Sequence, residues 1–151
     1  MFEDGPERLI LFRVGGEQFA LPMSDVDEVI DAPVIQHLPD AGPATLGIAG
    51  VRGVFVTVYD ARPILCVDGG TMGAALLFVR DDRRVGLAID DVFDPLTVGQ
   101  EELRPVPGAS DGIVIGLVRR GSQLVAVLDT QALLDAAAGA GRAGATQGGR
   151  T

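Results

Sequence analysis

A chain of 151 residues, of which 47% are hydrophobic and 22% charged, is long enough for one domain or for two small lobes that share a core. Its formal net charge of −9 argues against nucleic acid as a partner, because phosphate binding needs clustered Lys and Arg. One Cys and one His exclude an intrachain disulfide and leave too few ligands for a zinc site without help from carboxylates.

In the first half of the chain, short runs rich in Val, Leu and Ile alternate with Gly- and Asp-containing turns, a pattern that predicts strands. Gly15 and Gly16 separate the first two runs and predict a hairpin turn. A polar turn follows the second run. The strands predicted in this half are residues 8–14, 17–22, 26–30, 34–38 and 51–59.

The second half continues the pattern and then changes it. Strands are predicted at residues 74–79, 85–89, 113–118 and 124–128. Residues 130–138 predict the one helix of any length, with Asp129 or Thr130 as its N-cap. Residues 139–151 are rich in Gly and Ala and predict a disordered tail, while residues 1–7 form an N-terminal extension.

The two halves of the chain are related by an internal repeat. An offset of 66 residues aligns Leu11 with Leu77, and an offset of 69 residues aligns Val56 with Val125 and Asp60 with Asp129. The simplest explanation is two related half-barrels of about sixty residues each, packed against each other because neither buries much core alone. Val56 and Val125 are therefore expected at equivalent buried positions.

No motif in the chain assembles a catalytic or metal site. Nothing in the sequence brings Cys66 and His37 together, and Cys66 follows apolar residues, so we expect a buried structural thiol. Asp90, Asp91 and Asp94 lack the regular spacing of a Ca²⁺ loop and predict a solvated loop or a partner contact. We expect no enzyme activity, no cofactor and no metal.

The segment GIAGVRG at residues 47–53 places Arg52 between a Gly-rich turn and an apolar strand. An uncompensated guanidinium near apolar strands is costly, so a carboxylate partner is expected. Glu28, in the segment VDEVI, is the candidate. The alternative is that Arg52 is simply exposed at the start of a strand.

These segments, taken in order, resemble the CheW-like domain family. The first half reads FRVGGEQFALP, VDEVI, LP and GIAGVRGVFVTVYDAR, and the second reads RVGLAIDDV, LRPVP, GLV and VAVLD. The resemblance runs from about residue 8 to residue 136 and implies a CheW-like domain of two intertwined lobes at residues 8–138. The sequence departs from the family pattern at Gly50, Thr57 and Ala61.

The resemblance implies a mainly β fold of two SH3-like five-stranded barrels around a shared core, with a short C-terminal helix. It also implies an adaptor that couples the cytoplasmic tip of a methyl-accepting chemoreceptor to a CheA-like histidine kinase, in flagellar chemotaxis, pilus motility or another chemosensory pathway. The implied receptor-side residues lie in a groove between the lobes: Val26, Glu28, Gly47, Val51, Arg52, Gly53 and Gly86.

No apolar run approaches the ~20 residues that span a bilayer, and the acidic start does not resemble a signal peptide, so we expect a cytoplasmic protein without direct membrane insertion. The alternative function is a small-molecule-binding β-barrel that uses the groove between the lobes as its pocket.

Overall fold

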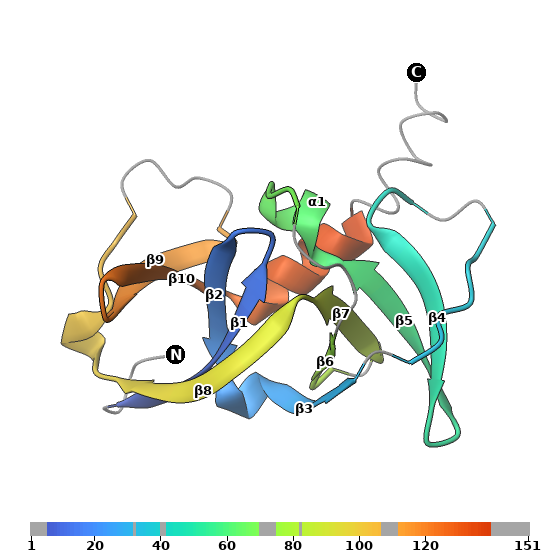
Figure 1. The fold of residues 1–151 in the computed structure, drawn as a ribbon, viewed down its shortest axis with the longest axis horizontal. Coiled ribbons are helices and arrows are strands. Elements are labelled where there is room, and N and C mark those ends of the chain that lie inside the picture. The colour runs from blue at the N-terminus through green and yellow to red at the C-terminus, as the bar shows by residue number, and fades with distance from the viewer. Residues whose placement is uncertain are drawn as a thin grey trace.

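The structure is a computed structural model that describes residues 6–31, 33–39, 42–69, 75–81, 83–106 and 112–139. The predicted tail, apart from residue 139, and most of the predicted N-terminal extension lie outside the described residues. Within these ranges, ten strands form two five-stranded sheets, and residues 130–139 are helical. The mainly β fold and the C-terminal helix are confirmed, and the curvature of the sheets is consistent with two SH3-like barrels (Figure 1).

The first sheet, sheet A, lies on the left of Figure 1 and the second, sheet B, on the right. Sheet A has the order β8 (Asp91–Val98), β1 (Glu7–Val14), β2 (Glu17–Pro22), β10 (Gln123–Leu128) and β9 (Val114–Arg120). Sheet B has the order β3 (Val26–Asp31), β6 (Ala75–Val79), β7 (Val85–Ile89), β5 (Val54–Asp60) and β4 (Thr45–Val51). The short helix α1 (Ala61–Leu65) follows β5.

The two repeats exchange hairpins. Sheet A joins β1 and β2 of the first repeat to β8, β9 and β10 of the second, and sheet B joins β6 and β7 of the second repeat to β3, β4 and β5 of the first. In Figure 1 the blue strands β1 and β2 accordingly lie between yellow β8 and orange β10. Each lobe therefore contains strands from both halves of the sequence.

The internal repeat is visible in the strand registers, because equivalent residues of the two halves pair with equivalent partners. In sheet B, Val56 on β5 pairs with Ala49 on β4, and in sheet A, Val125 on β10 pairs with Val118 on β9. Val56 and Val125 are both buried. The parallel junctions agree as well, because Thr57 aligns with Val85 where β5 meets β7, and Ala126 aligns with Phe19 where β10 meets β2. The predicted equivalence of Val56 and Val125 is confirmed.

Equivalent aspartates begin the two helices. The Asp60 carboxylate accepts a hydrogen bond from the backbone N–H two residues later, at 3.0 Å, and Asp129 does the same at 3.1 Å. Such a bond satisfies one of the N–H groups that the first helical turn leaves unpaired. The N-cap of the C-terminal helix is therefore Asp129, one of the two candidates predicted. Thr130 instead donates its hydroxyl to Asp25 at 2.6 Å.

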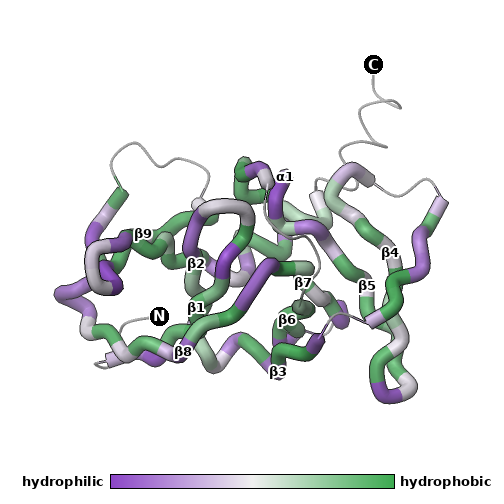
Figure 2. The backbone as a smooth tube through the Cα atoms, in the orientation of Figure 1, coloured by the Kyte–Doolittle hydropathy of each residue, from purple (hydrophilic) through white to green (hydrophobic). Residues whose placement is uncertain are grey.

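The central core lies between the sheets and is closed by the C-terminal helix. Phe12 and Phe19 of sheet A, Leu77 and Leu87 of sheet B, and Leu133 of the helix belong to one buried cluster. Two smaller clusters of buried side chains lie within the lobes, one formed mainly by residues of sheet A and the other mainly by residues of sheet B. Hydrophobic residues follow the strands and polar residues the turns, as Figure 2 shows. The helix thus joins the two lobes into one unit.

Two strand predictions are wrong in the middle of the first repeat. Residues 34–38 form no strand, and only Gln36 pairs there, in an isolated bridge with Ile48. Residues 51–59 are not one strand, because β4 ends at Val51 and β5 begins at Val54. Arg52 and Gly53 turn the chain between them with φ values of 51° and 78°, as two-residue hairpin turns of type I′ require.

Two further expectations are corrected by elements that were not predicted. Asp90 is buried, and Asp91 and Asp94 belong to strand β8, so the three do not form a solvated loop, while a partner contact stays a prediction. The strand lies at the edge of sheet A, where Pro95 is tolerated because one side of an edge strand needs no N–H donor. Cys66 is exposed rather than buried, because it ends helix α1 in the left-handed conformation.

Candidate functional site

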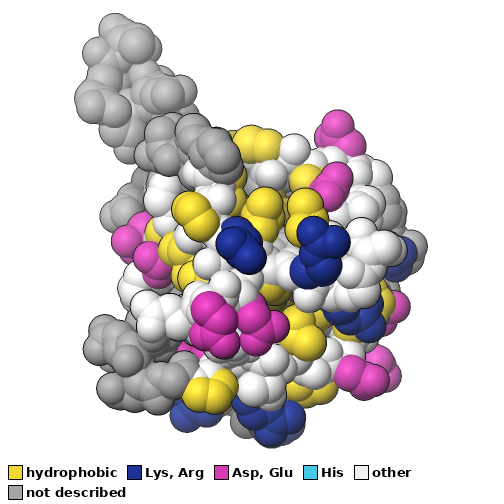
Figure 3. Space-filling view, turned by 90° about the vertical axis from the view of Figure 1, so that its left-hand side faces the viewer, with side chains coloured by type: hydrophobic (Ala, Val, Ile, Leu, Met, Phe, Trp, Pro, Cys, Tyr) yellow, Lys and Arg dark blue, Asp and Glu magenta, His cyan; other side chains and the backbone are white. Residues whose placement is uncertain are grey.

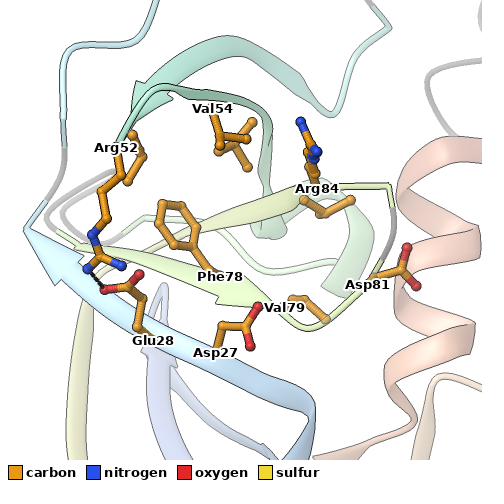
Figure 4. Close-up of a pocket in the computed structure, with 11 residues that line it drawn as sticks. Asp27, Glu28, Arg52, Val54, Phe78, Val79, Asp81 and Arg84 are labelled. Atoms are coloured by element: carbon orange, nitrogen blue, oxygen red, sulfur yellow. Dashed lines mark hydrogen bonds and ion pairs between the residues drawn. The ribbon is translucent and has the colours of Figure 1, made fainter.

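Sheet B carries a hollow of about 450 Å³ with an apolar floor and charged walls (Figure 4). Phe78 and Val79 of β6, Val56 of β5 and Val85 of β7 are buried apolar residues of its lining. The remaining lining residues are Asp27, Glu28, Val51, Arg52, Val54, Asp81 and Arg84. All the lining residues belong to sheet B or to its turns, so the hollow belongs to one lobe and is not the groove between the lobes that the resemblance implied.

An ion pair between Arg52 and Glu28 closes one side of the hollow. Glu28 lies on β3 and Arg52 in the β4–β5 turn, and β3 and β4 are the two edges of sheet B. The pair therefore links one edge strand of sheet B to the turn that follows the other edge strand. The Arg52 side chain is 71% exposed and that of Glu28 is 27% exposed, so the predicted pairing is present but lies at the surface.

The equivalent edges of sheet A are linked by a different interaction. The Arg120 guanidinium on β9 lies over the Phe93 ring on β8, 5.2 Å from the ring centroid. A cation over an aromatic face is attracted by the ring quadrupole. Both lobes thus use an arginine near the hairpin turn to bridge their edge strands, but only sheet B uses a carboxylate.

On the opposite side of the hollow, Asp81 is held by Arg83 in the β6–β7 turn. The Arg83 backbone N–H and Nε both donate to the Asp81 carboxylate, at 2.9 and 2.8 Å. The Arg83 side-chain hydrogen bond is the main reason why the pKa of Asp81 lies well below its ordinary value of 3.8. Arg83 also donates to Asp135 and Gln131 of the C-terminal helix, at 3.2 and 3.3 Å. The helix is thereby tied to the rim of the hollow.

Arg84 is the second cation of the lining, and its backbone has a left-handed φ of 56°. Its N–H donates to the Asp81 carbonyl at 3.1 Å, and its carbonyl accepts the Thr57 N–H at 3.0 Å. The side chain is exposed and points away from Asp81 (Figure 4). Within the part of the chain that the structure describes, the Arg84 guanidinium forms no ion pair.

Of the seven residues implied by the resemblance, Glu28, Val51 and Arg52 come together in the lining of the hollow. Gly53 completes the adjoining turn with a φ of 78°. Val26 is buried at the start of β3, where it belongs to the central core cluster.

Gly47 and Gly86 lie outside the lining and make room for neighbours. A Cβ on Gly47 would lie 2.0 Å from the Gln36 carbonyl oxygen, and one on Gly86 would lie 3.2 Å from the Leu76 side chain. Close packing against these neighbours explains why glycine occupies both positions. Sequence reasoning did not single out Phe78 or Arg84, although the charged turn before Val85 was the available signal for Arg84.

Each lobe also carries a smaller surface hollow over its β-hairpin, and the two occupy equivalent positions in the repeat. The one on sheet B is apolar, with Val34 91% exposed, and its lining is Val34, Gln36, Ile48, Gly50 and Phe55. The one on sheet A is lined by Glu101, Glu102, Arg104, Leu117, Val118, Arg119 and Leu124. Charged and hydrophobic side chains are mixed on the end of the molecule that carries sheet A (Figure 3).

Among the residues that the structure describes, no helix has the length and apolar character needed to cross a membrane. Within the same ranges, no group of three or more His, Cys, Asp or Glu side chains is placed to hold a metal ion. The chemistry of the main hollow is therefore that of apolar contact combined with carboxylates and guanidinium groups.

Comparison with known proteins gives consistent matches. The CheW-like domain family matches residues 8–138. Protein PilI of Pseudomonas aeruginosa is 32% identical over 123 residues, which cover 72% of this chain and 65% of PilI. The chemotaxis protein CheW of Bacillus subtilis is 24% identical over 136 residues, which cover 85% of this chain and 87% of that protein. This chain thus spans just under two thirds of PilI and most of the Bacillus protein.

A solved structure shares the fold. The crystal structure of the scaffolding protein TtCheW from Thermoanaerobacter tengcongensis has a TM-score of 0.71 with this chain, at 19% sequence identity. The match covers 82% of this chain and 89% of that chain. At this identity the likeness concerns the arrangement of the two sheets.

Proposed function

The chain belongs to the CheW-like domain family, and on that premise we propose that it is a non-catalytic cytoplasmic adaptor that couples chemoreceptors to a CheA-like histidine kinase. Its receptor partner is the cytoplasmic tip of a methyl-accepting chemoreceptor. The similarity to PilI supports a chemosensory pathway of the same general kind, in flagellar chemotaxis or pilus motility.

The observation that carries the proposal is the hollow on sheet B. Its floor is built from buried apolar side chains, among them Phe78 and Val56, and its rim holds the Arg52–Glu28 pair. Protein interfaces combine an apolar centre with a polar rim, and an amphipathic helix binds by placing its apolar face in such a site. The apolar face of a helical hairpin tip is the kind of partner surface that such a site accepts.

The lining argues against the alternatives of an enzyme or a small-molecule pocket. Its eleven residues include no Ser, Thr, Cys, His or Lys, so this set lacks a hydroxyl, thiol or amine nucleophile and an imidazole base. Two of its carboxylates, Glu28 and Asp81, are held by arginines rather than turned toward a bound molecule. The hollow suits a broad protein contact better than an enclosed ligand.

The proposal is tested at the Arg52–Glu28 pair. Arg52→Glu should remain folded but lose binding to a purified receptor-tip fragment, because the reversed charge repels Glu28 and reshapes the rim. The exchange of both residues, Glu28→Arg with Arg52→Glu, should recover part of the binding if pairing alone matters. Circular dichroism monitors folding, and binding to the fragment and to the kinase is measured for each variant.

Arg119→Glu is the matched control, since it reverses one exposed arginine on β9 in the other lobe. It should bind the receptor fragment as the unmodified protein does. A folded Arg52→Glu variant that binds the fragment normally would remove this site from the proposal. An unmodified protein that binds neither receptor nor kinase would overturn the proposed function itself.

A further inference from the structure

Left-handed backbone conformations single out the two arginines of the hollow. Among the described residues, three non-glycine residues have φ values in this region: Arg52 at 51°, Arg84 at 56° and Cys66 at 59°. A side chain is disfavoured there relative to glycine, and such residues concentrate at functional sites. Cys66 ends helix α1, a position that commonly takes this conformation. The two arginines instead occupy hairpin turns, where glycine would serve the backbone better.

The backbone of Arg84 does not depend on its side chain. Its N–H and carbonyl form hydrogen bonds with Asp81 and Thr57, and the next residue, Val85, begins strand β7. A glycine at this position could form the same two bonds without the conformational penalty. The turn therefore explains the φ of residue 84 but not the presence of a guanidinium.

The charges around the hollow leave Arg84 as the exception. Glu28 pairs with Arg52, Asp81 with Arg83 at 2.8 Å, and Asp27 with Arg80 at 3.3 Å. Every carboxylate of the lining thus has an arginine, whereas Arg84 has no ion-pair partner among the described residues. On a chain with a net charge of −9, a cation held over an apolar floor without a carboxylate is complementary to an anionic group brought by a partner.

We propose that Arg84 determines the specificity of this site by binding an Asp or Glu side chain of the docking partner. That carboxylate lies next to the partner's apolar residues, which contact the apolar floor of the hollow. The inference rests on the proposed function and names the chemistry of its partner. The planar guanidinium suits a carboxylate, with which it can form two parallel hydrogen bonds. Its position across the hollow from Arg52 places that carboxylate on the opposite flank from the Arg52–Glu28 pair (Figure 4).

The test compares variants of residue 84 against one receptor-tip fragment. Arg84→Gly and Arg84→Asn remove the cation and relieve the left-handed strain, so their melting temperatures should equal or exceed that of the unmodified protein. Their dissociation constants for the fragment should rise by on the order of tenfold, the usual effect of losing one charged hydrogen bond. Arg84→Lys should retain part of the affinity. Arg119→Asn, which removes an arginine from the other lobe, should bind normally.

The carboxylate is then located on the fragment. Each exposed Asp or Glu of the fragment is exchanged in turn for Asn or Gln, and binding is measured against the unmodified protein and against Arg84→Gly. One exchange should weaken binding to the unmodified protein and have little further effect on the glycine variant, because both changes remove the same contact. The salt dependence of binding should also be smaller for Arg84→Gly.

The outcomes separate this inference from the proposed function. If the unmodified protein does not bind the fragment, the proposed function fails and the inference fails with it. If Arg52→Glu loses binding while Arg84→Gly binds as tightly as the unmodified protein, only the inference is overturned. It is also overturned if Arg84→Gly binds weakly but no acidic residue of the fragment is coupled to residue 84.

Discussion

Gly47 and Gly116 show at the residue scale why the repeat keeps particular amino acids. A Cβ on Gly47 would lie 2.0 Å from the Gln36 carbonyl oxygen, and one on Gly116 would lie 2.8 Å from the Arg104 carbonyl oxygen. Gln36 and Arg104 form the two isolated bridges, to equivalent strands. In both lobes a neighbouring segment presses on the sheet at a point where only hydrogen fits, and this contact explains the matched glycines.

Replacing Gly47 should therefore be more damaging than replacing the nearby Gly53. Gly47→Ala should cost about 2–4 kcal/mol of unfolding free energy, because the new methyl group meets backbone and the φ of 152° disfavours it. Gly53→Ala should cost about 1–2 kcal/mol, since a Cβ there meets nothing within 4 Å and only the φ of 78° opposes it. Urea denaturation measures both, and equal losses would contradict the packing argument.

The Arg52–Glu28 pair should contribute little to stability, whatever its effect on binding. The Arg52 side chain is 71% exposed, and exposed ion pairs typically contribute about 0–1 kcal/mol. Thermal unfolding of Arg52→Ala, Glu28→Ala and the double variant forms a double-mutant cycle that isolates the pair. A coupling energy of several kcal/mol would show that the pair behaves as a buried one.

Residue-level prediction succeeded where a physical cost was visible in the sequence alone. Arg52 was expected to have a carboxylate partner, and Glu28 lies against it, although a side chain that is 71% exposed did not require one. Arg84 could not be identified in this way, because what distinguishes it is a φ of 56° and the lack of an ion pair within the described structure. Neither this backbone conformation nor the lack of an ion pair within the described structure can be read from the amino-acid sequence. The exposure of Cys66 likewise follows from where helix α1 ends.

At the scale of elements, the β6–β7 turn and the C-terminal helix behave as one unit. Arg83 contacts Asp81 within the turn and contacts Gln131 and Asp135 on the helix. The hydroxyl of Thr130 reaches Asp25, immediately before β3. The C-terminal helix follows β10 of sheet A in the chain, yet it is attached to two borders of the hollow on sheet B. Its docking therefore helps to set the shape of the rim.

The Asp81–Arg83 contact should make stability depend on acidity. Because the pKa of folded Asp81 is below its ordinary value of 3.8, the contact stabilises the fold above about pH 4 and loses its effect as the pH falls further. Asp81→Asn should be less stable at pH 7 and should lose less stability between pH 5 and about pH 2.5. Urea midpoints across this range provide the measurement.

Asp94→Asn is the control, since it removes an exposed carboxylate from β8 on the other sheet. It should leave the acid dependence close to that of the unmodified protein. If Asp81→Asn and the unmodified protein lose stability in parallel as the pH falls, the Asp81–Arg83 contact does not contribute as described.

Prediction of elements failed where the local signal was unusual. The β4–β5 turn uses Arg52 and Gly53 instead of the Asn-Gly or Asp-Gly pair that marks such hairpins, so residues 51–59 were predicted as one strand and most of β4 was not predicted. Strand β8 contains Pro95 and alternates poorly, because an edge strand can tolerate both features. Val34 suggested a strand through its apolar character, yet it lies 91% exposed.

At the scale of the whole molecule, the exchange of hairpins could not be predicted from the repeat. Equivalent strands have the same pattern in both halves, so β2 could pair equally with the last strand of its own repeat or with that of the other. The observed register aligns Phe19 on β2 with Ala126 on β10, from the second repeat. The similarity of the halves indicated two lobes and left open which strands build each one.

The exchange predicts that neither half of the chain folds alone. A fragment of residues 1–69 contains β1 to β5 but lacks β6 and β7, and a fragment of residues 70–151 lacks β1 and β2. Each should give a non-cooperative thermal transition by circular dichroism, and an equimolar mixture should regain a cooperative one. A cooperative transition in either isolated fragment would contradict the shared sheets.

The same exchange governs how the protein can fold during synthesis. Gln18 on β2 and Gln123 on β10 are neighbours in sheet A but are 105 residues apart in the chain. At a translation rate of about 5–20 residues per second, the ribosome needs roughly 5–20 s to add that stretch. During this interval β2, the strand that contains Leu21, lacks its partner β10, although β8 becomes available earlier to pair with β1. Folding of the nascent chain is therefore a late event, completed only when the last strand leaves the ribosome, and the hairpin must be protected from aggregation until then.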